Sequence, residues 1–253
     1  MKNLLLLLLA LALYACGDTP TDDALGETDM VEEADDPAAT LTATNQAVAS
    51  AAGGDLTALP AAAALDNIET WGEQLEGVDG AEKVTGNLET LGEELQKDPI
   101  NGSLVGMLLT TLAEDTRQVA GSAPGVSQLV SALRAGGEKL TSGAAFEGDG
   151  LLSQTLRAGK EKMGDITTLA PEAATTNIDS WIAELQGMED TDDMVEQLQS
   201  LKNEISQPSI DGGKVADLLM DLAADTREMA GDNQALHTLA YLLEAGSYRV
   251  DGN

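Results

Sequence analysis

The chain has few of the residue types on which metal sites and disulfides depend. Its 253 residues include one cysteine and one histidine, and aromatic residues make up 2% of the sequence. A single cysteine allows no disulfide within the chain. Zinc and other transition metals are held by clusters of cysteine and histidine, which this sequence lacks. We therefore expect no metal site and no cofactor.

Basic residues are also scarce. Lysine and arginine number 13 against 44 aspartates and glutamates, for a formal net charge of −31. Nucleic acid and anionic lipid headgroups repel such a chain, so neither is an expected partner surface. The acidic, aromatic-poor composition resembles that of proteins from salt-adapted organisms. In such proteins, charges are screened over a Debye length of about 3 Å at 1 M salt.

No apolar run is long enough to span a bilayer, which takes about 20 residues in a helix. The longest, Leu4 to Leu13, follows Lys2 and is typical of a secretory signal peptide. It leads into Leu13-Tyr14-Ala15-Cys16, which resembles a bacterial lipobox. The resemblance implies that residues 1–15 are removed and that Cys16 carries the lipid. The protein would then be held at a membrane of the cell envelope by its N-terminal acyl groups.

An acidic segment follows the predicted lipid attachment site. Residues 17–39 carry nine acids and no base. Such a composition cannot bury enough apolar surface to fold, so residues 16–40 are predicted to be a disordered tether. Gly17 stands where an aspartate signals inner-membrane retention in the familiar lipoprotein sorting rule. The resemblance therefore implies an outer-membrane anchor, with the folded part facing the periplasm or exposed on the cell surface.

The rest of the chain is a tandem duplication. Residues 54–136 align with residues 164–246 without a gap, and Asp115-Thr116-Arg117 recurs 110 positions later as Asp225-Thr226-Arg227. Apolar residues recur at helical spacing in four segments of each copy, and no segment alternates as a strand would. The pattern predicts an all-α protein of two tandem repeats, each an up-and-down bundle of about four helices.

The predicted domains follow from this duplication. The first bundle covers residues 41–137 and the second covers residues 164–253. Residues 138–163 form a linker, in which the leucines after Gly150 suggest a short helix. Asn101 and Asp211 are expected to cap the third helix of each copy, and Asp232 the fourth helix of the second copy.

A few charged residues shared by both copies are candidates for a site. On the helix that carries Asp115 and Arg117, Thr116 points toward the core and its two neighbours lie on opposite shoulders. Asp115 and Arg117 should therefore each reach a neighbouring helix, with Glu94 as the expected partner of the arginine. In the second copy, Asp225 and Arg227 are placed in the same way, and Glu204 is the expected partner. These residues form either inter-helix salt bridges or a site for an anionic ligand.

Trp71 and Trp181 are the two tryptophans of the chain. Each lies on an apolar stripe, which favours a place in the core. The alternative is an anchor for a partner protein, because tryptophan is enriched among interface hot spots.

The duplication also argues against catalysis. His237 corresponds to Ser127 in the other copy, so the repeats share no histidine base, and we expect no catalytic residue. The sequence instead favours a lipid-anchored envelope protein that binds another envelope protein or acts as a scaffold. The alternative is a lipoprotein that holds an anionic small molecule at Arg117 and Arg227 or between the bundles.

Overall fold

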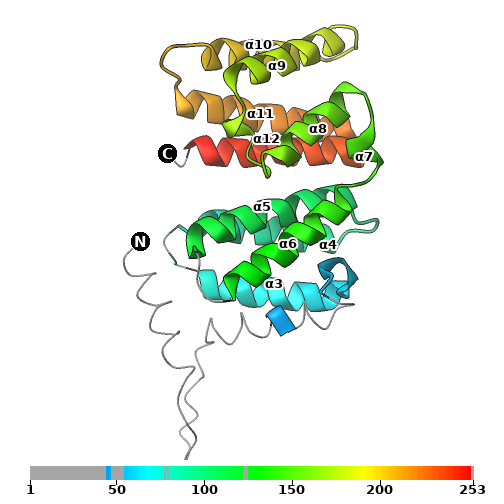
Figure 1. The fold of residues 1–253 in the computed structure, drawn as a ribbon. Coiled ribbons are helices and arrows are strands. Elements are labelled where there is room, and N and C mark those ends of the chain that lie inside the picture. Colours follow the sequence, from blue (N-terminus) through cyan, green and yellow to red (C-terminus); the bar gives the residue numbers. More distant parts are fainter. Residues whose placement is uncertain (1–43, 47–53, 77, 79, 122–124, 252–253) are drawn as a thin grey trace, which may run out of the picture. The chain divides into compact units, whose positions relative to one another are not determined.

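The computed structural model describes residues 44–46, 54–76, 78, 80–121 and 125–251. The predicted signal peptide, Cys16 and the acidic tether lie outside these residues. Throughout the described part of the chain, all regular secondary structure is helical (Figure 1), which confirms the all-α class. The elements are η1 (Leu56–Ala58), α3 (Ala61–Leu75), α4 (Glu82–Leu95), α5 (Gly102–Ala120), α6 (Val126–Leu140), α7 (Ala144–Glu147), α8 (Leu151–Glu161), η2 (Ile166–Thr168), α9 (Pro171–Leu185), α10 (Asp192–Ile205), α11 (Gly212–Ala230) and α12 (Gln234–Asp251).

The helices of the two copies begin and end at equivalent positions. Helices α3, α4 and α5 recur as α9, α10 and α11 with the same lengths and an offset of 110 residues, and η1 recurs as η2. The fourth pair is less regular, since α12 is longer than α6. The apolar stripes and the helix ends were read separately from each copy, and both readings agree with the structure.

Side-chain caps begin two of these helices as expected. The Oδ1 atom of Asn101 accepts hydrogen bonds from the backbone N–H groups of Ser103 and Leu104, at 3.1 and 3.2 Å. Asp211 caps α11 through the N–H of Lys214, at 3.3 Å. The cap expected at Asp232 was wrong by one residue. Asn233 accepts from the N–H groups of the first turn of α12 instead.

The described residues form two compact units. The first comprises the described residues up to Gln96 together with Leu112–Ala135, and the second comprises Lys97–Thr111 together with the described residues from Gly136 onward. The units therefore do not coincide with the two sequence copies, because α5 and α6 each contribute residues to both. Within the first unit, α3 packs against α4, and Ala113, Val126 and Val130 form a buried cluster.

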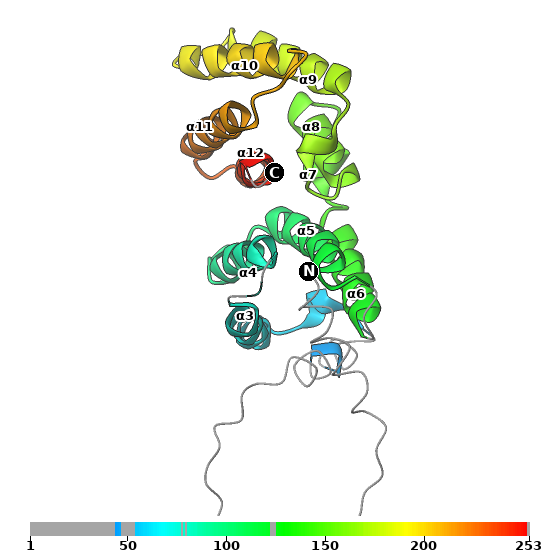
Figure 2. The same cartoon turned by 90° about the vertical axis from the view of Figure 1, so that its left-hand side faces the viewer.

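Five helices of the second unit follow one another around a ring. Helix α8 contacts α9, which contacts α10; α10 contacts α11, and α11 contacts α12. Helix α12 in turn contacts α8 and closes the ring, which is seen nearly end-on in Figure 2. The short helix predicted in residues 138–163 is therefore α8, and it packs as a fifth helix beside the four expected in the second copy. None of the helices in the described part of the chain is both long and apolar enough to cross a membrane.

Candidate ligand-binding site

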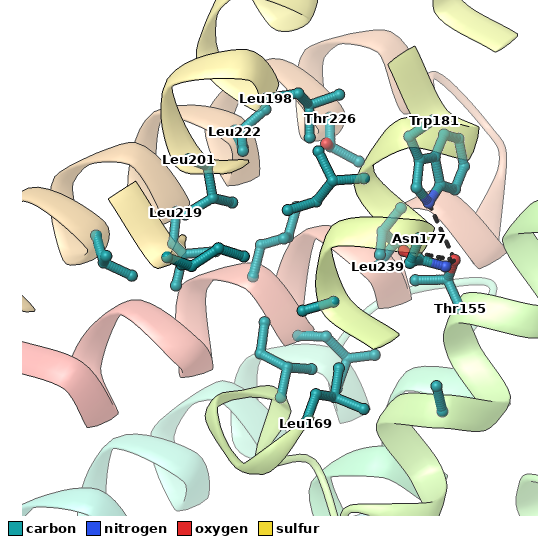
Figure 3. Close-up of a pocket in the computed structure, with 18 of the residues that line it drawn as sticks. Thr155, Leu169, Asn177, Trp181, Leu198, Leu201, Leu219, Leu222, Thr226 and Leu239 are labelled. Atoms are coloured by element: carbon teal, nitrogen blue, oxygen red, sulfur yellow. Dashed lines mark hydrogen bonds between the residues drawn. The ribbon is translucent and has the colours of Figure 1, made fainter. Parts of the chain in front are cut away.

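The ring of the second unit encloses a cavity of about 460 Å³. Most of the side chains that line it are aliphatic, and they come from all five helices and from η2 (Figure 3). The lining residues are Thr155, Ala158, Ile166, Thr167, Leu169, Pro171, Ala173, Ala174, Asn177, Ile178, Trp181, Leu185, Met194, Leu198, Leu201, Ile205, Ile210, Val215, Leu219, Leu222, Thr226, Met229, Leu236, Leu239, Leu242, Leu243 and Val250. None of them is charged.

Small residues shape the wall of this cavity. A Cβ atom on Gly159 of α8 would lie 2.6 Å from Cδ1 of Leu242, and one on Gly246 of α12 would lie 2.8 Å from Ile166. Glycine at these two positions therefore lets α8 and η2 lie close to α12. On the opposite side of the ring, Ala173 and Ala174 of α9 carry only methyl groups to the lining. Because side chains this short cannot reach across the ring, the interior stays open.

A polar cluster stands at one side of the cavity, where Figure 3 shows Trp181, Asn177 and Thr155 together. The indole N–H of Trp181 donates to Thr155 Oγ1 at 3.0 Å, and the Asn177 Nδ2 donates to the same oxygen at 2.9 Å. The Thr155 hydroxyl donates its own hydrogen to the carbonyl of Leu151, at 2.9 Å. One donor and two acceptor positions are all that a hydroxyl offers, so Thr155 is fully satisfied.

The first copy contains the same cluster. Trp71 donates its indole N–H to Thr44 Oγ1 at 3.0 Å, and the Thr44 hydroxyl donates to Asn67 Oδ1 at 3.1 Å. The tryptophans and asparagines are 110 residues apart, but Thr44 and Thr155 are separated by 155 − 44 = 111. One extra residue in the second copy moves the threonines out of register. A gapless alignment that begins at residue 54 therefore misses them, although an alignment with one gap would find them.

Both tryptophans thus have polar partners within their own units. Trp71 and Trp181 are half-buried, and each joins the first long helix of its copy to a threonine that precedes the copy in sequence. Trp181 also lines the cavity. The place expected on the apolar stripe was correct, but the cavity beside Trp181 was not anticipated.

Thr226 is the second polar feature of the cavity wall. Its side chain is 3% exposed, and it lies among the lining residues in Figure 3. None of the hydrogen bonds among the described residues involves its hydroxyl. A buried hydroxyl without a partner is costly, by about 1–3 kcal/mol. Thr226 therefore offers a donor and two acceptor positions to whatever occupies the cavity.

The arginines predicted as site residues lie on the surface. Arg117 is ion-paired within its own helix with Glu114, which also accepts from Arg134 of α6 at 3.1 Å. The hydrogen bond from Arg117 is the main cause that lowers the pKa of Glu114. In the second copy, Arg227 reaches Glu244 of α12 at 2.5 Å. The charges are exchanged between copies, because Glu244 occupies the position that corresponds to Arg134.

The predicted pairs of Arg117 with Glu94 and of Arg227 with Glu204 were therefore wrong. Glu204 lies at the end of α10, where its carboxylate accepts from the backbone N–H of Asp211 at 3.0 Å and pairs with Lys214 at 2.8 Å. Arg227 follows Asp211 by 16 residues, about 24 Å along the helix axis. The two helices are joined by a short turn, so the end of one lies near the start of the next and far from its other end.

The glutamates themselves are buried at the helix ends. Glu94 is 2% exposed and Glu204 is 8% exposed. The hydrogen bond from the Lys214 ammonium lowers the pKa of Glu204 most, and the backbone N–H of Asp211 lowers it further. Glu204 thus ties the end of one helix to the start of the next within the second unit.

The aspartates of the repeated triplet do reach a neighbouring helix, as expected. Asp115 accepts from Asn87 Nδ2 of α4 at 2.8 Å, and Asp225 accepts from Gln197 Nε2 of α10 at 2.9 Å. These contacts correspond exactly in the two copies, although asparagine in one is glutamine in the other. The partners are amides, not arginines.

Among the described residues, no group of histidine, cysteine, aspartate and glutamate side chains is arranged to hold a metal ion. Comparisons of the chain with protein-family models, with curated proteins and with solved structures found no match.

Proposed function

We propose that this protein is a lipid-anchored protein of the cell envelope whose second unit binds a small apolar molecule. The lipobox-like sequence ending at Cys16 supports the anchor. The cavity of about 460 Å³ supports the binding, and it is the observation that carries the proposal. Ligand sites in proteins commonly measure about 300–1,000 Å³ and are lined mainly by apolar side chains with a few polar groups. The cavity of the second unit fits this description.

The cavity supports a ligand better than the arginines do. Arg117 and Arg227 are each paired with a carboxylate and half or more exposed at the surface, with 53% and 48% of their side chains accessible. An anionic molecule would have to displace those carboxylates in a chain with a net charge of −31. We therefore place the ligand of the second hypothesis in the cavity and not at the arginines.

A protein partner has less support from the surface of the second unit. Met188 and Ile210 are each 51% exposed, but they lie at opposite ends of α10. Single exposed apolar side chains are normal in soluble domains and do not mark a docking surface. An envelope protein partner is therefore an alternative outcome of the experiment below.

The test is to identify what accompanies the acylated protein when it is purified from the membranes of its own cells. Wild-type protein is compared with Ala174→Phe, which places an aromatic ring in the cavity, and with Ala183→Phe on the exposed face of the same helix. We expect one class of small apolar molecule, near one per chain, in the wild type and in Ala183→Phe but not in Ala174→Phe. Equal amounts in all three would mean that the cavity is not the binding site. A stoichiometric envelope protein crosslinked in the cell, with no such molecule, would favour the scaffold.

A further inference from the structure

The chemistry of the cavity wall restricts the ligand further. This step rests on the proposed function, since it concerns the same cavity. We infer that the ligand is an uncharged, single-chain lipid with one polar group, and that this group hydrogen-bonds to the hydroxyl of Thr226.

The first argument is the absence of any positive charge in the lining. An ion moved into an apolar interior loses its hydration, and it is tolerated only when a counter-charge or several hydrogen bonds replace it. The basic side chains around the ring are already engaged with carboxylates. Those pairs are Lys202 with Asp179 at 2.6 Å, Lys214 with Glu204 at 2.8 Å, Arg227 with Glu244 at 2.5 Å and Arg249 with Asp165 at 3.9 Å. A carboxylate or phosphate inside the cavity would find no such partner among the lining residues, so the ligand is uncharged.

The second argument concerns size. An apolar cavity of about 150 Å³ accommodates a benzene ring. A cavity of about 460 Å³ is three times larger, which corresponds to roughly 15 to 18 carbon atoms at the same packing. A single acyl or isoprenoid chain has this volume, whereas a lipid with two long chains exceeds it.

The third argument locates the polar group of the ligand. Four lining residues have polar side chains besides the indole of Trp181: Thr155, Thr167, Asn177 and Thr226. Thr155 is saturated by its three hydrogen bonds. Thr167 is exposed and donates its hydroxyl to Asp165. Asn177 gives an N–H to Thr155.

Thr226 differs from these residues because it is buried and its hydroxyl takes part in no hydrogen bond among the described residues. It lies on α11, across the ring from the cluster of Trp181, Asn177 and Thr155, as Figure 3 shows. A hydroxyl or carbonyl on the ligand would satisfy it, and the aliphatic side chains would surround the remainder of the chain.

The experiment compares three probes of the same chain length: 1-dodecanol, dodecanoate and dodecane. They are titrated below their solubility limits at pH 8 into the mature chain, residues 16–253, with Cys16→Ser so that the protein carries no acyl group of its own. Binding is followed by the fluorescence of Trp181 in a Trp71→Phe background. We expect dodecanol to bind at least about 100-fold more tightly than dodecanoate, because only the carboxylate must be buried as an ion.

Variants at one position then test the hydrogen bond. Thr226→Val should weaken dodecanol binding by about 3- to 10-fold and leave dodecane unchanged, whereas Thr226→Ser should retain the dodecanol affinity. Thr116→Val, at the corresponding position of the first copy, is the matched control and should change neither. Circular dichroism confirms that each variant is folded.

Each outcome separates the two proposals. If dodecanoate binds as tightly as dodecanol, the uncharged ligand class is overturned and the cavity remains a binding site. If Thr226→Val binds dodecanol like the wild type, the assigned polar contact is wrong. If none of the three probes binds, the proposed function itself fails.

Discussion

Filling the cavity with protein atoms should stabilise the protein without its ligand and abolish binding. Ala174 is half-buried on α9 and lines the cavity. In Ala174→Phe, the added ring needs about 150 Å³, roughly a third of the 460 Å³ available. Empty cavities cost about 24 cal/mol per Å³, so the ring could recover at most about 3.6 kcal/mol. Strain from imperfect fit opposes this by about 1–3 kcal/mol.

The expected net gain in the free energy of unfolding is therefore about 1–2 kcal/mol. For a protein of this size each kcal/mol raises the melting temperature by about 2–4 °C, so the increase should be about 2–8 °C. The ligand loses space for about six carbon atoms at about 0.8 kcal/mol each, which corresponds to a loss of affinity of at least about 1,000-fold.

Scanning calorimetry without ligand and a dodecanol titration measure both effects. Ala183→Phe makes the same substitution at an exposed position of α9 and should change the melting temperature and the affinity little. A fall of several degrees in the melting temperature of Ala174→Phe would mean that the interior has no room for the ring. Unchanged dodecanol affinity in a stable Ala174→Phe protein would refute the assignment of the binding site to this cavity.

Four further predictions follow from individual contacts. Thr155→Val leaves the buried N–H of Trp181 without its acceptor, and the free energy of unfolding measured in urea should fall by about 1–3 kcal/mol. The pKa of Glu204 is lowered in the folded state, so its stabilising effect is present above the unfolded value of 4.5 and disappears as the pH falls through the folded pKa. Glu204→Gln should therefore lower the melting temperature near pH 6 and differ less from the wild type near pH 3; a constant difference would contradict this assignment. Because 44 acids face 13 bases, the melting temperature should rise between low and molar salt, and an unchanged value would exclude salt adaptation. Cys16→Ser should move the protein from the membrane to the soluble fraction of the cell envelope, and continued membrane retention would argue against the acyl anchor.

The features that could be predicted from the sequence are those with a local cause. Apolar residues at helical spacing identify helices because a helix brings every third or fourth side chain to one face. The cap at Asn101 could be read in the same way, because its partners are two and three residues away. The duplication strengthened these predictions, since each helix end was read twice and α3 to α5 match α9 to α11 residue for residue.

The features that could not be predicted depend on which helices lie side by side. Glu204 was assigned to the wrong base because the antiparallel turn places it beside Asp211 and Lys214, far from Arg227. Thr155 was overlooked because it acts only when α8 packs against α9 and its hydroxyl meets Trp181.

The cavity is a property of the closed ring and of no single segment. Its lining consists of leucines, isoleucines and alanines that the sequence presents as ordinary core residues. Hydrophobic patterning determines which side chains leave water, but not how completely they fill the space between five helices. The amino-acid sequence alone thus determined the helical class, the duplication and the expected lipid anchor. Only the tertiary structure decided that the second unit is hollow, because packing depends on the shapes and distances of side chains from all five helices together.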